Sequence, residues 1–82
     1  MYEIKATVTK ATSNDVKLIG DWPVAWLQAP GSIDEPEILH KLIPGQVYET
    51  FGGQTQRSEI YHPGNPLNLR VGDEVIVRCK RV

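Results

Sequence analysis

The sequence has only one cysteine, Cys79. A single thiol cannot form an internal disulfide, so the fold is not a disulfide scaffold and no oxidising compartment is implied. Cys79 stands in step with Val75 and Val77 in an alternating segment. This placement favours a core position for the thiol over a reactive one.

A surplus of basic residues is also lacking. Nine Lys and Arg residues stand against ten Asp and Glu residues, and the formal net charge is −1. Proteins that bind nucleic acid chiefly through its phosphates usually carry a basic surplus. Binding of single-stranded nucleic acid on one face of the fold therefore ranks behind other partner classes, although the basic residues at 78–81 permit it.

The sequence contains no apolar run that approaches the ~20 residues of a membrane-spanning helix. It also lacks the N-terminal basic-then-apolar segment and small-residue cleavage site of a signal peptide. We therefore expect a soluble, cytoplasmic protein with no membrane partner. Its 82 residues suit one compact β domain over 1–82, without tails or linkers and with a small core.

Metal-binding and catalytic spacings are absent from the sequence as well. His40 and His62 are far apart, and no His-x-His, Cys-x-x-Cys or His-Glu-x-x-His pattern occurs. A nucleophilic Cys79 would need its thiol at the mouth of a cleft, whereas the alternation directs it into a core. We therefore expect no metal, no cofactor and no enzymatic activity.

The chain does have period-two alternation near both ends. Apolar and polar residues alternate over Tyr2–Val8, and near the other end Val75, Val77 and Cys79 alternate with a second set that begins with Ile76 and Arg78. Such alternation sends one set of side chains to a core and the other to a wetter face. It predicts two strands that lie side by side in one rolled sheet. A polar turn at 11–15 followed by Val16–Ile19 predicts that the first strand returns as a hairpin.

Further short strands are predicted between these ends. Pro23 has no backbone N–H, so Gly20–Pro23 is expected to interrupt the returning strand. Runs rich in β-branched and aromatic residues favour strands, and clusters of polar residues and glycine favour loops. We expect strands at Val24–Gln28, Gln46–Phe51 and Ile60–Tyr61, with loops at 52–59 and 62–66.

One segment has the pattern of a helix. Asp34 and Glu37 have the spacing of a capping box, and Pro36 suits a first helical turn. Apolar residues follow at helical spacing until Pro44 and Gly45. The pattern predicts one short helix near 34–43, and a strand over Ile38–Ile43 is the alternative.

These elements predict a mainly β fold. Five or six short strands with hairpin-like links and one short helix are typical of a small barrel or rolled sheet, of SH3-like or OB-like type. Closure into a barrel also removes the exposed edges that an open sheet would have.

The first candidate is an aromatic group, in which Trp22 is selected as a binding residue; its members are Trp22, Trp26, Tyr48, Phe51 and Tyr61. Trp22 and Trp26 are four residues apart, which places both side chains on one side of an extended strand. An exposed indole offers a broad stacking surface with a polar N–H. The alternative is structural, with Trp26 in the core and Trp22 half-exposed as a cover over one end of the barrel.

The second candidate is the loop from Gly52 to Pro66, with Arg70 as a further cation beyond it. Arg57 and Arg70 carry planar cations that suit a carboxylate or a phosphate. Tyr61 offers a ring for stacking, and His62 stands beside it. These residues are typical of a pocket for a small anionic molecule or nucleotide, and equally of a solvated loop.

We therefore expect a non-enzymatic binding module that contacts another protein or assembles with itself. The last strand carries apolar residues on both faces, with Ile76 and Val82 opposite Val75 and Val77, which favours a homo-oligomer. The alternative is an anionic small molecule or nucleotide bound in a loop pocket by Arg57, Tyr61 and Trp22.

Overall fold

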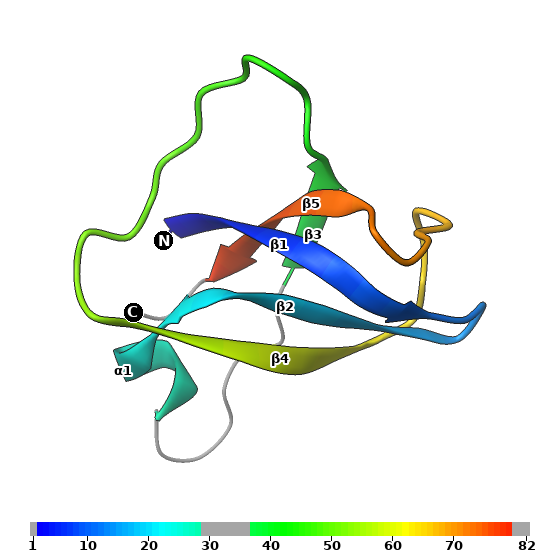
Figure 1. Ribbon diagram of the computed structural model, residues 1–82, viewed down its shortest axis with the longest axis horizontal. Helices are drawn as coiled ribbons and strands as arrows, with labels where there is room; N and C mark the ends of the chain where they lie inside the picture. Colours follow the sequence, from blue (N-terminus) through cyan, green and yellow to red (C-terminus); the bar gives the residue numbers. More distant parts are fainter. Residues whose placement is uncertain (1, 29–36, 80–82) are drawn as a thin grey trace.

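The computed structural model describes residues 2–28 and 37–79, which form one five-stranded antiparallel sheet and one short helix (Figure 1). The order of the strands across the sheet is β3-β5-β1-β2-β4. The elements are β1 (Tyr2–Ala11), β2 (Asp15–Pro23), α1 (Val24–Leu27), β3 (Glu37–Lys41), β4 (Thr55–Pro63) and β5 (Glu74–Cys79). Within the described residues, no helix has the length and apolar character needed to cross a membrane.

The two alternating ends form neighbouring antiparallel strands, as predicted. The register runs from Tyr2 opposite Cys79 to Thr7 opposite Glu74. Ile4 and Val77 face each other in the core, where both side chains are buried. The predicted extension of the last strand over residues 80–82 lies outside the described residues.

The hairpin of β1 and β2 is also confirmed, but β2 is longer than predicted. The Thr12 N–H donates to the Asp15 carbonyl at 2.9 Å, which closes the turn. Gly20–Pro23 does not interrupt the strand. The even-numbered residues of β2 form the backbone hydrogen bonds to β4, and Pro23 is odd-numbered, so its missing N–H costs no bond to β4. The missing N–H of Pro23 therefore lies on the other side, where pairing with β1 has already ended.

Gly20 allows Trp22 to fold back over the strand. A Cβ at residue 20 would lie 3.1 Å from the Trp22 ring and 3.2 Å from the Lys5 carbonyl oxygen. The Trp22 ring therefore occupies space that any larger residue at position 20 would need.

The prediction of a polar loop over 52–59 is wrong from Thr55 onward, where β4 begins. β4 pairs with β2 along its full length, from Pro63 opposite Asp15 to Thr55 opposite Pro23. The side chains of its outer face are exposed and, apart from Tyr61 and Pro63, polar, so the strand carries little hydrophobic signal. Pro63 is tolerated because its missing N–H points away from β2.

The prediction of a helix near 34–43 is wrong in its described part. Glu37–Lys41 forms β3, which pairs antiparallel with β5, and residues 34–36 of the proposed cap lie outside the described residues. The alternative of a strand over Ile38–Ile43 was closer. Pairing with β5 decides the conformation, because strand preference depends on the neighbouring strand more than on local sequence.

Two other predicted strands are absent. Val24–Leu27 forms the short helix α1, which buries Trp26 against the core. Gln46–Phe51 has no regular structure and belongs to a segment that we call the arm (residues 42–54). The arm stands out from the sheet in Figure 1, and its residue Val47 is 93% exposed. Phe51 returns the arm to the sheet through an edge-on contact with Tyr2, with ring centroids 4.9 Å apart.

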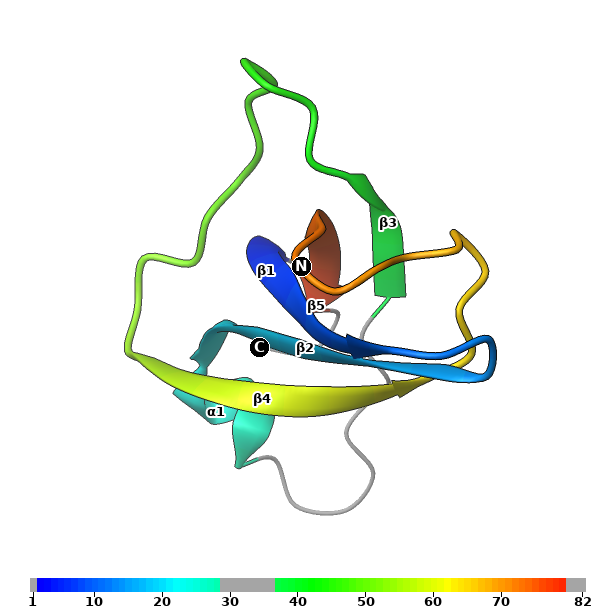
Figure 2. The same cartoon turned by 45° about the vertical axis from the view of Figure 1, so that its right-hand side comes forward.

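The sheet is rolled but is not closed into a barrel within the described residues, where β3 and β4 are its outer strands. Figure 2 shows β3 steeply inclined to β4, with β1 between the two halves. Strand residues of the inner face, together with Trp26 and Leu69, form the core. The mainly β class is thus confirmed, and closure of the barrel is not.

We predict that Trp22→Ala lowers the free energy of unfolding by roughly 3–5 kcal/mol, because it empties a fully buried site. Urea denaturation followed by circular dichroism measures this loss. Val47→Ala is the matched control and should change stability by less than about 0.5 kcal/mol. A Trp22→Ala loss below about 1 kcal/mol would contradict the structural role of this residue.

Candidate functional site

The five residues predicted as ligand contacts do not gather at one place. Trp22 is fully buried, and its Nε1 donates to the Ser58 carbonyl oxygen at 2.8 Å. Its ring also lies against Trp26, with centroids 5.6 Å apart. The indole that was predicted to stack on a ligand is therefore inside the core and its N–H is already bonded.

Arg57 and Tyr61 share the outer face of β4, where both are exposed. The Arg57 guanidinium lies 3.6 Å from a carboxylate oxygen of Asp21 on β2. His62 points to the inner face, and its Nδ1 lies 3.4 Å from the Gly64 carbonyl oxygen. Arg57 and Tyr61 thus form a surface, whereas His62 lies on the other side of the sheet.

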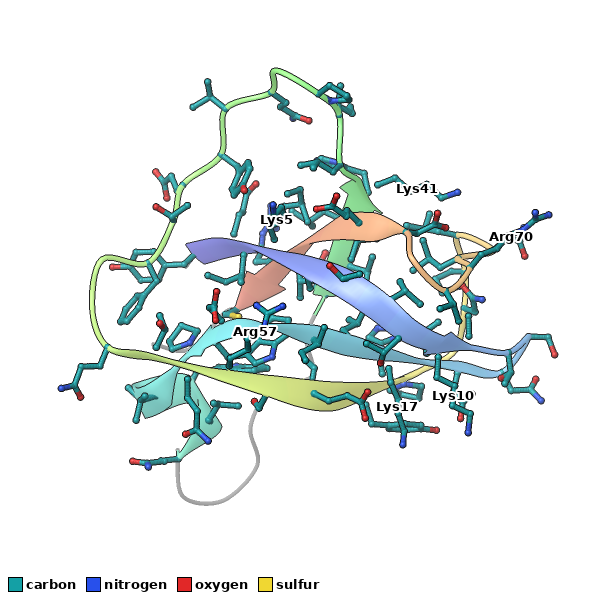
Figure 3. All side chains as sticks on the ribbon, viewed as in Figure 1. Lys5, Lys10, Lys17, Lys41, Arg57 and Arg70 are labelled. Carbon is teal, nitrogen blue, oxygen red and sulfur yellow. The ribbon has the colours of Figure 1, made fainter. Side chains whose placement is uncertain are left out.

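Arg70 lies in the turn before β5, at the opposite end of the sheet from Arg57 (Figure 3). Its backbone N–H donates to a carboxylate oxygen of Asp73 at 2.9 Å. This bond, aided by Lys41, holds the pKa of Asp73 below its ordinary value. The backbone of Arg70 therefore shapes a turn, and its exposed side chain is remote from the other predicted contacts.

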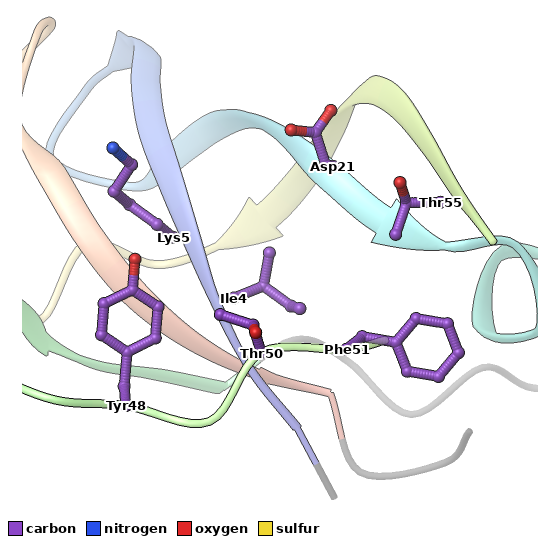
Figure 4. Close-up of a pocket in the computed structure, with 7 residues that line it drawn as sticks. All are labelled: Ile4, Lys5, Asp21, Tyr48, Thr50, Phe51 and Thr55. Atoms are coloured by element: carbon purple, nitrogen blue, oxygen red, sulfur yellow. The ribbon is translucent and has the colours of Figure 1, made fainter. Parts of the chain in front are cut away.

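A pocket that the sequence did not reveal lies between β1 and β2 (Figure 4). Pairing of these strands ends at Ala6 opposite Gly20. Beyond that point β1 continues beside β5, and β2 continues beside β4, so the two strands diverge. The resulting notch has a volume of about 300 Å³, and it is lined by Ile4, Lys5, Asp21, Tyr48, Thr50, Phe51 and Thr55.

The pocket has an apolar floor and a charged rim. Lys5 and Tyr48 lie on one side of it, and Asp21 and Thr55 lie across from them in Figure 4. The Lys5 ammonium is 3.4 Å from a Glu74 carboxylate oxygen, and both side chains remain about half exposed. An exposed ion pair of this kind is weak, so a charged ligand could compete for Lys5. The pocket suits a small molecule with an apolar ring and an anionic group.

The outer edge of β4 is a second candidate site. One backbone hydrogen bond lies just beyond each end of the β2–β4 ladder. The Val24 N–H donates to the Gln54 carbonyl, and the Gly64 N–H donates to the Asn14 carbonyl. Hydrogen-bonded pairs alternate in an antiparallel ladder, so even-numbered residues of β4 bond to β2. The backbone groups of Thr55, Arg57, Glu59 and Tyr61 therefore point outward, and no strand in the described part of the chain pairs with them.

Most cations of the sheet already have acidic partners. Lys17 pairs with Glu59 at 3.8 Å and Lys41 with Asp73 at 3.4 Å, in addition to the pairs of Lys5 and Arg57. Phosphate binding would have to compete with these carboxylates. Among residues 2–28 and 37–79, no group of three or more His, Cys, Asp or Glu side chains is placed to hold a metal ion.

Ile76 does not supply the oligomer contact that the sequence suggested. Its side chain lies on the opposite face of β5 from Val75 and Val77, yet only 1% of it is exposed. The chain itself therefore covers this residue. Its predicted companion Val82 lies outside the described residues.

Comparison with models of protein families, with curated proteins and with solved structures finds no match. Function must therefore be argued from the two sites themselves. The sequence identified Arg57 and Tyr61 of the β4 edge, but of Lys5, Asp21 and Tyr48 in the pocket it named only Tyr48, as a member of the aromatic group. These three come from separate segments, and only the divergence of β1 and β2 brings them together.

We predict that the Cys79 thiol does not react with iodoacetamide at pH 8 in the folded protein. Burial raises the pKa of this thiol to about 11 from its ordinary 9.0, so both thiolate and access are lacking. Mass spectrometry after a timed reaction checks this, with urea-unfolded protein as the control. Rapid alkylation of the native protein would contradict the buried position.

The same shift gives a pH dependence of stability. The thiol stays protonated in the folded state at a pH where the unfolded chain has released that proton. The contribution of this thiol to the free energy of unfolding is complete below pH 9.0 and is lost as the pH rises toward about 11. Urea denaturation across this range should show a decline that is smaller in Cys79→Ala.

Proposed function

We propose that this protein is a non-enzymatic binding module that contacts another protein, or a further copy of itself, through the outer edge of β4. The observation that carries the proposal is the row of outward backbone groups on a nine-residue edge strand. An added strand would exchange their bonds to water for bonds to a partner, and outer side chains would select that partner.

The composition of the edge supports a specific partner. Arg57 and Glu59 place charges on it, and Pro63 removes one outward donor near its end. Charges and proline on edge strands discourage indiscriminate strand pairing. A partner must therefore match the charges and must end its pairing before Pro63.

The exposed apolar side chains of the arm offer a further contact surface. Val47 is 93% exposed, and Ile43, near the start of the arm, is 55% exposed. A partner that covers these side chains would remove apolar area from water, which stabilises association. The arm is thus a secondary contact in the proposal.

Two further parts of the proposal concern closure and location. Closure of the rolled sheet into a barrel would pair β4 with β3 and consume the same edge, so partner binding requires that the sheet stay open. A cytoplasmic location remains part of the proposal, and the single buried thiol is compatible with it.

We predict that the protein at micromolar concentration has a mass above the 9.2 kDa of one chain, and that Tyr61→Pro returns it to that mass. The Tyr61 N–H points outward, so proline removes an edge donor and leaves the ladder to β2 intact. Size-exclusion chromatography with light scattering measures both masses. Tyr61→Ala is the control, because it keeps the N–H. A wild-type mass of 9.2 kDa would end the self-assembly proposal.

A second candidate function is the binding of a small anionic molecule or nucleotide in the pocket. Lys5 beside the rings of Tyr48 and Phe51 favours it, because a cation and aromatic faces suit an anionic, ring-containing ligand. Arg57 contributes through its contact with Asp21 on the pocket rim. In this reading, Lys5 replaces Trp22 as the principal contact.

For this second candidate, we predict that adenosine monophosphate raises the melting temperature of the protein and that Lys5→Ala weakens binding roughly ten-fold, because a charge-assisted contact is lost. Thermal-shift titration followed by calorimetry measures the effect. Lys10→Ala removes an exposed cation that does not line the pocket and should leave affinity unchanged. Equal affinity for wild type and Lys5→Ala would remove Lys5 from the site.

A further inference from the structure

The geometry of β4 restricts how a second strand can add to it. Only the backbone groups of Thr55, Arg57, Glu59 and Tyr61 point outward, so a new ladder must place its bonded pairs at these residues. Beyond Tyr61, Pro63 offers no donor. The available edge is therefore short, and only a few registers use all of it.

If the added strand is β4 of a second copy, a two-fold axis relates the strands and fixes which residues face each other. An axis at Arg57 would place this cation opposite itself, and an axis at Glu59 would place this carboxylate opposite itself. Like charges directly opposite destabilise a strand pair. An axis at Ser58 instead places Arg57 of each copy opposite Glu59 of the other.

The Ser58 register also uses the whole edge. It places Thr55 opposite Tyr61 of the second copy, so that all four outward residues of each strand enter bonded pairs. The next bonded pair would need the absent N–H of Pro63, which ends the ladder. On the inner face, Gln56 comes opposite Ile60 of the second copy, whose side chain is only partly buried in one chain.

The charges of β2 extend this complementarity. Within one copy, Arg57 lies 3.6 Å from Asp21, and Glu59 lies 3.8 Å from Lys17. The Ser58 register joins these pairs into a line of alternating charge, from Asp21 and Arg57 of one copy to Glu59 and Lys17 of the other. Networks of charges stabilise more than isolated surface pairs.

We propose that the partner of the β4 edge is a second copy of this chain, added antiparallel about a two-fold axis at Ser58, with reciprocal Arg57–Glu59 pairs across the interface. The inference rests on the proposed function and names its partner. The two sheets would become one sheet that is continuous across both copies.

The register is tested by cysteine cross-linking. Residues 58 of the two copies would form a pair without mutual backbone hydrogen bonds, with Cα atoms about 4.5 Å apart, which a disulfide can span. Ser58→Cys should therefore give a covalent dimer under mild oxidation on a non-reducing gel. The buried Cys79 contributes no background, as wild type treated in parallel would show.

Gln56→Cys is the matched control for the cross-link. In the Ser58 register the two residues 56 are four positions apart along the strands, or about 13 Å, so they cannot form a disulfide. A cross-link in Gln56→Cys with none in Ser58→Cys would overturn the register.

A charge exchange tests the reciprocal pairs. Arg57→Glu puts like charges opposite each other twice, and we expect it to raise the dimer dissociation constant roughly ten-fold. The double variant Arg57→Glu with Glu59→Arg restores opposite charges across the axis and should restore the dimer. Within each chain, however, it places like charges beside Asp21 and Lys17, so recovery cannot come from intrachain pairs.

These outcomes separate the inference from the function on which it rests. Suppose that wild type is a dimer, but Ser58→Cys gives no cross-link or the double variant does not restore the dimer. Either result overturns the register while self-assembly stands. A wild-type monomer overturns both the register and self-assembly, and leaves the β4 edge as a contact for another protein only. A cross-linked dimer restored by the charge exchange supports the two-fold pairing of β4.

Discussion

β1 is hydrogen-bonded on both sides, to β5 and to β2, and every other part of the fold depends on this central position. Its inner side chains Ile4, Ala6 and Val8 face the buried side chains of both neighbours. β3 then joins the sheet through β5, and β4 joins it through β2. Loss of either β1 ladder would separate the sheet into a three-stranded and a two-stranded part, and a two-stranded part is marginally stable at best by itself.

The same arrangement creates both candidate sites. The β1–β2 ladder stops at Gly20, and the divergence of the strands beyond it opens the pocket. β4 pairs with the other side of β2 along its full length, which leaves β4 itself as an edge. Arg57 connects the two sites, because its guanidinium contacts Asp21 on the pocket rim while its backbone belongs to the free edge. In the proposed dimer, the Arg57 side chain lies between Asp21 of its own chain and Glu59 of the second copy.

Sequence reasoning found part of the β4 site and, of the pocket, only the aromatic residues Tyr48 and Phe51. Arg57 and Tyr61 were selected for their chemistry, and the structure places both on an exposed face. Trp22 was selected for the same reason, but Gly20 lets its ring fold into the core. There the carbonyl oxygen of Ser58 accepts a hydrogen bond from the indole N–H. The pocket could not be predicted, because its residues share no spacing along the chain. Their proximity results from where one ladder ends.

By itself the sequence determined β1, whose inner and outer faces differ, the run of β-branched residues in β5, and the hairpin that follows β1. Burial on one face imposes alternation, and alternation is visible in one dimension. Only the tertiary structure decided β3 and β4. Glu37–Lys41 carries helix signals, so a strand was only the alternative there. Thr55–Pro63 is largely polar on its exposed side, so only Ile60–Tyr61 within it was predicted as a strand. Each became one because a neighbouring strand offered unpaired backbone groups, and that need for hydrogen bonds outweighed local preference.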